Sequence, residues 1–386
     1  MPLPRTRTTA AGALGCAGLL LVGWTGLLVP SLIRSIEADF ALSDAGIGVF
    51  FFVISVAYVA GSMLGGLLTE RIGRRVVLPM AVLLIASGLA GMALVPTWGA
   101  FLALGIPFGF GSGAIDGGAN GLILDLYPIN RGRALNVLHL FFSLGALASP
   151  LVVGRLVEAG VAWQAIIGVT AAAAIPLAVL LALAPLPSGR HHRSGAIDGA
   201  RIGLALPLVA LAIAIGCYVA SEVGVSNWLV RFLETASIGL ATSALALFWG
   251  SLALGRMVSA KLGDRFDHAR FAAAAALIAA IALVAATLVP SLPASIVLFG
   301  VVGFAYGPVY PLIMAVAGDR FPGRSAAVGG FLAGFAVIGA IVYPPVMGFI
   351  SVGLGLGAAM LGAAALAFAC SLVLFGVARR PIPAGE

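Results

Sequence analysis

Charge is scarce in this chain of 386 residues. Only 9% of the residues are Asp, Glu, Lys or Arg, whereas a soluble domain usually has about a quarter. Hydrophobic residues make up 61% of the chain, and the mean hydropathy is +1.15. This composition predicts an integral membrane protein and excludes both a disordered chain and a soluble multidomain enzyme.

Cysteine and lysine are also rare, and their positions exclude further classes of protein. The three cysteines all lie in apolar runs, so neither a disulfide framework nor a metal site is expected. The single lysine, Lys261, follows Ala260, so an ATP-binding Gly-Lys-Ser/Thr loop is missing. The pair His191 and His192 lacks further ligands. We therefore expect no enzyme, no cofactor and no metal.

Long apolar runs fill most of the chain. A membrane-spanning helix needs about 20 apolar residues, and we expect the first run to be a span rather than a cleaved signal peptide. The pattern predicts twelve spans, near 11–34, 45–69, 76–95, 98–124, 133–155, 161–184, 203–230, 240–260, 271–289, 293–317, 325–349 and 354–377. The prediction is an all-α membrane protein.

The basic residues fall almost entirely on one side of these spans. With the N-terminus inside, 18 of the 21 Lys and Arg residues lie on the inner side, and only Arg34, Arg155 and Arg231 lie outside. The positive-inside rule thus predicts a multi-pass protein of the inner or plasma membrane with both termini in the cytoplasm. Because the charges sit in short loops rather than on a continuous face, the net charge of +7 does not indicate a nucleic-acid partner.

The two halves of the chain repeat each other. Glu70-Arg71 returns as Asp264-Arg265, an offset of 194 residues. The same offset relates further pairs: Gly109 and Gly303, Asp125 and Asp319, Pro128 and Pro322, Pro150 and Pro344, Gly154 and Gly348. We predict two six-helix bundles, 1–184 and 203–386, joined by a cytoplasmic linker at 185–202.

The span at 98–124 carries two stripes. Glycines every fourth residue lie along one side of a helix, where they let neighbouring helices approach closely: Gly105, Gly109, Gly113, Gly117 and Gly121. Rotated by about 100° are Ser112, Asp116 and Asn120. A carboxylate is costly in hydrocarbon, so Asp116 is expected to have a function.

Few acidic side chains lie well inside the spans. Of the 14 acidic residues, only Asp116 and Glu222 are placed well inside the membrane, and no Lys or Arg is expected there as their fixed partner. The next span carries Asn136, His139 and Ser143 on one face. We expect Asp116, Asn120, Asn136, His139 and Glu222 to bind the solute or a proton. Pairing of Asp116 with Asn136 or His139 as a purely structural contact is the alternative.

Aromatic side chains could complete such a site. Trp24, Trp228, Tyr306 and Tyr310 could stack on the apolar faces of a sugar, and we place Trp24, Trp228 and Tyr310 among the solute-binding residues. Ordinary packing explains these aromatic residues equally well. A purely structural role is also the alternative for Glu222 and His139.

The loop after the second span has a recognisable pattern, Gly66-Leu-Leu-Thr-Glu70-Arg71-Ile-Gly73-Arg74-Arg75. Gly66 would allow a close helix crossing, and arginines can hold helix C-termini. The loop resembles the signature loop of the major facilitator superfamily, with Glu70 where Asp is commoner. Gly255-Arg256 and Gly263-Asp264-Arg265 extend the resemblance to the second half.

This resemblance implies two bundles around a central cavity lined by the first, fourth, seventh and tenth predicted spans. The resemblance further implies transport by alternating access. It also implies a conformational gate in the two loops, with contacts that form in one state and break in the other. The expected gate residues are Gly66, Glu70, Arg71, Gly73, Arg74, Arg75, Asp264 and Arg265.

A narrower resemblance lies in the fourth and fifth spans. These spans contain Asp116-Gly-Gly-Ala-Asn120 followed by Arg133-Ala-Leu-Asn136, which resembles a pattern of the fucose–proton symporters. In those proteins the acid of the fourth span lies in the sugar and proton pathway, so the resemblance implies this role for Asp116. Glu222 with Trp228, and Tyr310 in helix 10, are similar to members of the same group. The carboxylate that these symporters carry in helix 1 has no equivalent in Gly23-Trp24-Thr25-Gly26. Fucose itself is therefore not indicated.

The expected function is proton-coupled symport of a small polar solute such as a sugar. The partners are the solute, protons and the lipid bilayer, and a monomer is expected. Gly145-Ala-Leu-Ala-Ser149-Pro150 partly resembles a motif of antiporters, so a proton-driven exporter of amphipathic compounds is the alternative. The intact loop pattern argues against a sensor without transport.

Overall fold

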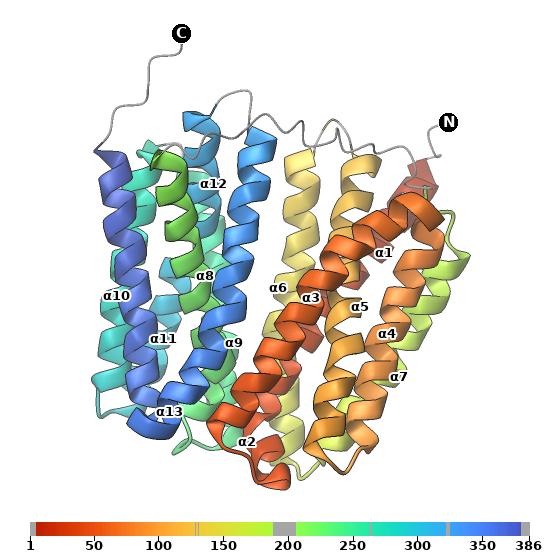
Figure 1. The fold of residues 1–386 in the computed structure, drawn as a ribbon, viewed down its shortest axis with the longest axis horizontal. Helices are drawn as coiled ribbons and strands as arrows, with labels where there is room; N and C mark the ends of the chain where they lie inside the picture. The colour runs from red at the N-terminus through yellow and green to blue at the C-terminus, as the bar shows by residue number, and fades with distance from the viewer. Residues whose placement is uncertain are drawn as a thin grey trace. The chain divides into compact units, whose positions relative to one another are not determined.

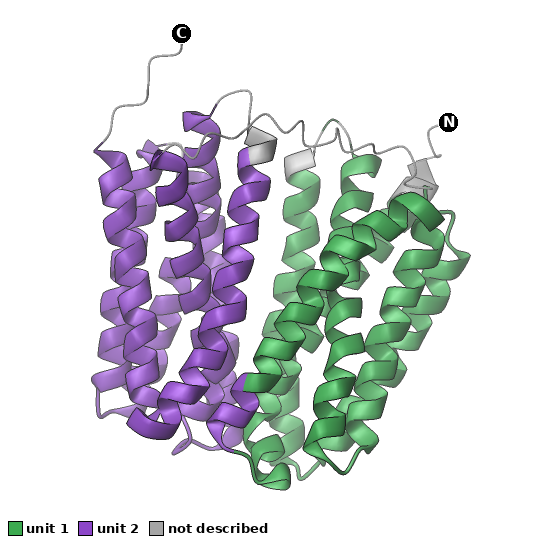
Figure 2. Ribbon diagram, viewed as in Figure 1, with its two compact units in different colours: residues 1–42, 49–195 green, residues 43–48, 196–386 purple. Residues whose placement is uncertain are grey.

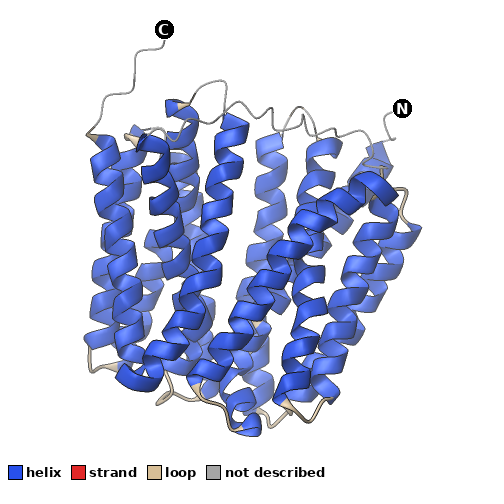
Figure 3. Ribbon diagram, viewed as in Figure 1, coloured by secondary structure: helices blue, strands red, loops and turns tan. Residues whose placement is uncertain are grey.

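The structure is a computed structural model. It describes the backbone of residues 5–127, 129, 131–187, 206–262, 265–321 and 325–379. In these residues the secondary structure is helical, as Figure 3 shows. Most of the predicted linker lies outside the described residues, as do Asp264, His191 and His192.

The chain divides into two compact units (Figure 2). Unit 1 comprises residues 1–42 and 49–195, and unit 2 comprises residues 43–48 and 196–386. Residues 43–48, which include the first turn of the helix Asp44–Ile72, are grouped with unit 2, whereas the rest of that helix belongs to unit 1.

Unit 1 contains the helices of the first half (Figure 1): α1 (Arg5–Gly26), α2 (Leu28–Phe40), most of α3 (Asp44–Ile72), α4 (Arg74–Leu94), α5 (Trp98–Leu126), α6 (Arg131–Glu158) and α7 (Trp163–Leu183). Together α1 and α2 form one apolar stretch long enough to cross a membrane. Within the unit α4 packs against α5 and α7, and α1 packs against α6.

Unit 2 contains the helices of the second half: α8 (Leu206–Phe232), α9 (Ile238–Leu262), α10 (His268–Leu288), α11 (Leu292–Tyr306), α12 (Val309–Arg320) and α13 (Ser325–Ala378). Gly307 and Pro308 separate α11 from α12, since Pro308 has no amide hydrogen to donate to a helix. Within the unit α8 and α10 pack against α13, and α9 packs against α11.

The described residues form eleven helical stretches that are long and apolar enough to cross a membrane. The last of them, α13, has 54 residues and breaks at Gly355, whose φ of 77° lies in the left-handed region that favours glycine. Since α13 therefore contributes two spans, the twelve predicted spans are confirmed. The predicted loop before residue 354 is only a kink.

The predicted repeat appears in the packing inside each unit. In unit 1 a Cβ on Gly61 would overlap the carbonyl oxygen of Phe110, and in unit 2 a Cβ on Gly255 would overlap that of Phe304. Gly109 against Ile54 and Gly303 against Phe248 form a second matching pair. All these residues are related by the offset of 194. The two halves thus use glycine at equivalent helix crossings.

The glycine stripe of α5 packs as predicted. Successive glycines face Phe50, Ile54, Tyr58 and Ser62 of α3, and at Gly109 and Gly113 an added Cβ would meet backbone oxygen. Close approach of the two helices therefore fixes the rotation of α5. That rotation determines where the neighbouring stripe with Asp116 points.

Candidate functional site

Asp116 lies in a polar cluster within unit 1. The side-chain amide of Asn120 donates a hydrogen bond to Asp116 Oδ1 at 3.1 Å and another to the Asp116 carbonyl oxygen at 2.9 Å. The hydroxyl of Tyr58, on α3, and the ring of His139, on α6, lie close enough to interact electrostatically with the carboxyl group. Asp116 and Asn120 are partly buried. Three helices therefore meet at one carboxyl group.

The polar face of α6 contributes His139 to this cluster. His139 and Asn136 are both exposed within the structure, whereas Ser143 is buried and donates to the His139 carbonyl oxygen at 3.1 Å. Ser112 is likewise satisfied inside its own helix, by the Phe108 carbonyl oxygen at 2.9 Å. Among the described residues no Lys or Arg forms an ion pair with Asp116, so no fixed cation neutralises its charge.

Tyr58 is a member of this cluster that the sequence analysis missed. One signal for it existed, because Tyr58 lies in a span and its carbonyl oxygen faces Gly113 of the glycine stripe. Trp24 is partly buried, and its indole nitrogen donates to the hydroxyl of Thr170 on α7 at 3.3 Å. This contact favours the packing interpretation of Trp24.

A second polar cluster, around Glu222, lies in unit 2. Glu222 of α8 is 6% exposed, and its Oε1 lies 3.8 Å from Nη2 of Arg256 on α9. The expectation that no basic residue would partner either intramembrane acid is therefore wrong for Glu222. Arg256 lies six residues before the end of α9, and its long side chain carries the charge away from its Cα toward Glu222.

Tyrosine hydroxyl groups surround the pair of Glu222 and Arg256. The buried hydroxyl of Tyr218 lies beside both charged groups and interacts with each, although it forms no hydrogen bond of good geometry with either. Tyr306, also fully buried, shares a hydrogen bond of 2.5 Å with Ser221, whose hydroxyl is 2.6 Å from the Ala363 carbonyl oxygen. The interior of unit 2 thus contains two charges and several hydroxyl groups.

The structure places the other two aromatic candidates differently. Trp228 is fully buried and donates from its indole nitrogen to the Pro344 carbonyl oxygen at 2.8 Å. This arrangement makes Trp228 a packing residue of α8 against α13. Tyr310 is partly buried in the first turn of α12, so its predicted role stays a prediction.

The loop between α3 and α4 holds a buried arginine. Arg74 lies 2.5 Å from Oδ2 of Asp125 at the end of α5, and the two side chains are 5% and 18% exposed. Gly73 has a φ of 87°, which starts α4 at the angle that brings Arg74 inward. The remaining candidate gate residues of this loop, Glu70, Arg71 and Arg75, are exposed.

The close helix crossing expected at Gly66 is absent. A Cβ there would meet nothing within 4 Å, whereas a Cβ on Gly65 would lie 2.9 Å from Ala114 Cβ of α5. A shift of one residue turns a side chain by about 100° around a helix. Gly65, rather than Gly66, therefore faces α5.

The repeat places a histidine where unit 1 has Arg74. In unit 2, His268 Nδ1 lies 2.9 Å from Oδ2 of Asp319, and both residues stand 194 positions after Arg74 and Asp125. These side chains are 25% and 53% exposed. The second-half gate residue Arg265 is exposed, and Asp264 lies outside the described residues.

We expect Asp125→Asn to destabilise the protein by about 3 kcal/mol or more, because it leaves the buried Arg74 guanidinium without a carboxylate. The thermal midpoint in detergent would measure this loss. The repeat supplies the control: Asp319→Asn removes an exposed carboxylate and should change stability by less than about 1 kcal/mol. Equal losses in both variants would show that the Arg74 pair has no special structural weight.

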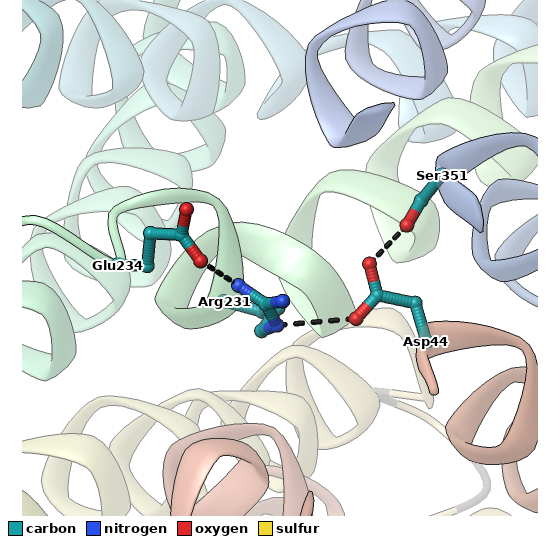
Figure 4. Close-up of polar contacts among 4 residues, drawn as sticks. All are labelled: Asp44, Arg231, Glu234 and Ser351. Carbon is teal, nitrogen blue, oxygen red and sulfur yellow. Dashed lines mark hydrogen bonds and ion pairs between the residues drawn. The ribbon is translucent and has the colours of Figure 1, made fainter. Parts of the chain in front are cut away.

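A further charged cluster anchors the first turn of α3 within unit 2 (Figure 4). Asp44 pairs with Nε of Arg231 at 3.1 Å and accepts a hydrogen bond from Ser351, while Arg231 also pairs with Glu234. A Cβ on Gly348 of α13 would lie 2.5 Å from the Asp44 carbonyl oxygen. From the sequence, Arg231 was expected only as an outer charge, and this cluster was not predicted.

Known proteins resemble this chain over nearly its full length. The model of the Major Facilitator Superfamily matches residues 13–234 and 205–386. A gentisate transporter of Corynebacterium glutamicum is 26% identical, with 95% of this chain and 87% of the relative covered.

Solved structures share the fold at lower identity. A bacterial homologue of the human lysosomal transporter Spinster has a TM-score of 0.81 at 17% identity, covering 99% of this chain and 100% of that chain. The D-xylose–proton symporter has a TM-score of 0.79 at 17% identity, covering 98% and 99%. The twelve spans thus form a fold that these transporters share.

Proposed function

Because the chain belongs to the Major Facilitator Superfamily and is a multi-pass membrane transporter, we propose that it couples the uptake of a small polar solute, such as a sugar, to protons by alternating access. Uptake of this kind needs a group that gains and loses a proton during the cycle. It also needs a place where the solute is held.

One observation carries the proposal, namely the Asp116 carboxyl group on a membrane-spanning helix. In the described part of the chain it has hydrogen bonds from Asn120 and electrostatic contact with Tyr58 and His139, but no ion pair with Lys or Arg. A carboxyl group held by neutral donors and a titratable ring can take up a proton without leaving a cation unpaired. Asp116 is our proposed coupling group, with Asn120, Asn136 and His139 as polar partners.

Two lines of similarity bear on the solute. The pattern from Asp116 to Asn136 resembles the fucose–proton symporters, which favours a sugar. The gentisate transporter carries, by its name, an aromatic acid. A panel of candidate solutes therefore has to include neutral polyols and acids of similar size.

The remaining predictions are part of the same proposal. We place the protein in the cell membrane as a monomer with both termini in the cytoplasm. Residues 1–184 and 203–386 act as the two bundles, joined by the linker at 185–202. The cytoplasmic gate that changes during the cycle comprises Gly66, Glu70, Arg71, Gly73, Arg74, Arg75, Asp264 and Arg265, with Asp125 as the partner of Arg74.

Purified protein in liposomes with a trapped pH dye tests this function. Neutral sugars, polyols and small organic acids are added singly from outside at constant external pH. Acidification of the interior by one solute, beyond that in empty liposomes, supports proton symport. Alkaline shifts driven by amphipathic compounds would instead support the exporter, and the absence of any solute-dependent proton movement would contradict proton coupling.

A further inference from the structure

The pair of Glu222 and Arg256 leaves hydrogen-bonding capacity unused. At 3.8 Å the contact between Nη2 and Oε1 is an ion pair but too long for a hydrogen bond. The guanidinium carries five donor hydrogens, and its contacts with Glu222 and the Tyr218 hydroxyl leave most of these donors available. The adjacent Tyr218 hydroxyl is buried and interacts with Glu222 and Arg256, but it too forms no hydrogen bond of good geometry with either.

Such an arrangement is unfavourable as pure structure. An ion pair away from water stabilises a protein only when its geometry is good and its remaining donors are satisfied. Elsewhere in unit 2 the polar groups are well satisfied, as with Ser221 at 2.5 Å from Tyr306 and 2.6 Å from Ala363. Glu222 is buried, whereas the Arg256 side chain is 35% exposed, so the unused donors of Arg256 are open to another molecule.

The chemistry of the donors selects the ligand. A guanidinium offers a planar fork that matches a carboxylate bidentately. The Tyr218 hydroxyl can donate a third hydrogen bond to the same anion. A neutral sugar would satisfy the donors less well, because a hydroxyl group cannot accept both forks and carries no charge.

On the basis of the proposed solute transport, we propose that Arg256 and Tyr218 form the binding subsite for a carboxylate group of the transported solute. Glu222 is the internal carboxylate that occupies Arg256 while no solute is bound. The substrate class is then a small organic acid that also carries neutral polar groups.

Charge balance implies that Glu222 also takes up a proton when the solute binds. The groups that face Glu222 in the described residues are Tyr218 on α8, Arg256 on α9 and Tyr306 on α11. Arg256 is their only cation, so it can neutralise either Glu222 or the incoming carboxylate. When the solute carboxylate takes Arg256, Glu222 takes up one proton from water, and the cluster again has no net charge. Binding of the acid is therefore expected to strengthen as the pH falls.

Matched pairs of probes that differ only in the carboxylate test this subsite. Glucuronate is compared with glucose, nicotinate with nicotinamide, and gentisate with 2,5-dihydroxybenzyl alcohol, by direct binding to purified wild-type protein at two pH values. The expected result is that at least one acid binds, at least about tenfold more tightly than its neutral partner and more tightly at the lower pH. No binding by any acid, or equal binding by the neutral partner, would overturn the subsite.

Three variants separate the roles within the cluster. Glu222→Gln removes the internal competitor and should tighten binding of the acid and abolish its pH dependence. Arg256→Gln should weaken binding by at least about tenfold. Because Arg256→Gln leaves a buried unpaired carboxylate and can fail to fold, the double variant Glu222→Gln/Arg256→Gln removes both charges and keeps the test valid. Retained selectivity for the acid in the double variant would contradict the role of Arg256.

The proposed function fails in a different way. If an acid binds but no solute moves protons in liposomes, proton coupling is wrong and the subsite stands. If only neutral solutes bind and move protons, the coupling stands and the subsite is wrong.

Discussion

Asp116→Asn is expected to abolish solute-dependent proton uptake while solute exchange across the membrane continues. Asn has nearly the same shape as Asp and retains an oxygen that can accept the hydrogen bond from Asn120, which is 3.1 Å long in the wild type. The substitution therefore removes the proton-binding group and leaves the local packing in place. In liposomes with a trapped pH dye, the solute-dependent signal should fall by about tenfold or more.

The exchange measurement distinguishes lost coupling from lost binding. Liposomes loaded with unlabelled solute take up labelled solute by exchange, a process that needs no net proton movement. Asp116→Asn should preserve this exchange. A wild-type pH signal in Asp116→Asn would exclude Asp116 as the coupling group.

Glu158→Gln is the matched control for this substitution. It also turns a carboxylate into an amide in unit 1, but at the end of α6, where Glu158 lies 4.0 Å from the exposed Arg155. Exposed ion pairs such as Arg155 with Glu158 contribute little to stability. The Glu158 carboxylate is also far in sequence from the polar stripe of α5. Full coupling in Glu158→Gln, beside loss in Asp116→Asn, would assign the effect to the Asp116 position.

The sequence predicted the twelve spans and the polar stripe of α5 because both depend on local patterns. Apolar length defines a span, and spacing by four residues defines one side of a helix. Asp116 was found in this way, since a carboxylate in an apolar helix is unusual in itself. The boundaries of α5 moved by only two residues for the same reason, predicted at 98–124 and observed at Trp98–Leu126. The spans predicted at 11–34 and 293–317 are each observed as two helices, α1 with α2 and α11 with α12.

The partners of the intramembrane acids could not be predicted in the same way. Arg256 was assigned to the inner loop region because it lies near the end of its span, yet its side chain reaches Glu222 on another helix. Tyr58 resembles any aromatic residue of an apolar run until the packing of α3 on α5 is known. Both depend on which helix faces which neighbour, and local periodicity contains no such information.

Gly113→Ala is expected to destabilise the protein, although alanine favours a helix by about 1 kcal/mol over glycine. A Cβ at this position would overlap the carbonyl oxygen of Tyr58, and a backbone oxygen cannot move aside as a flexible side chain can. Helices α3 and α5 would have to separate. Overpacking of this kind outweighs the gain in propensity, and we expect a net loss of about 2 kcal/mol or more, measured as a lower thermal midpoint in detergent.

Gly99→Ala on the same helix is the control. A Cβ there would meet nothing within 4 Å, so propensity alone acts and the thermal midpoint should stay the same or rise. A drop of equal size in both variants would assign the effect to α5 in general rather than to its crossing with α3. The crossing also holds the Tyr58 hydroxyl beside the Asp116 carboxyl group. Any Gly113→Ala protein that still folds should therefore also show weaker proton coupling, because separation of the helices moves Tyr58 away from the group that binds the proton.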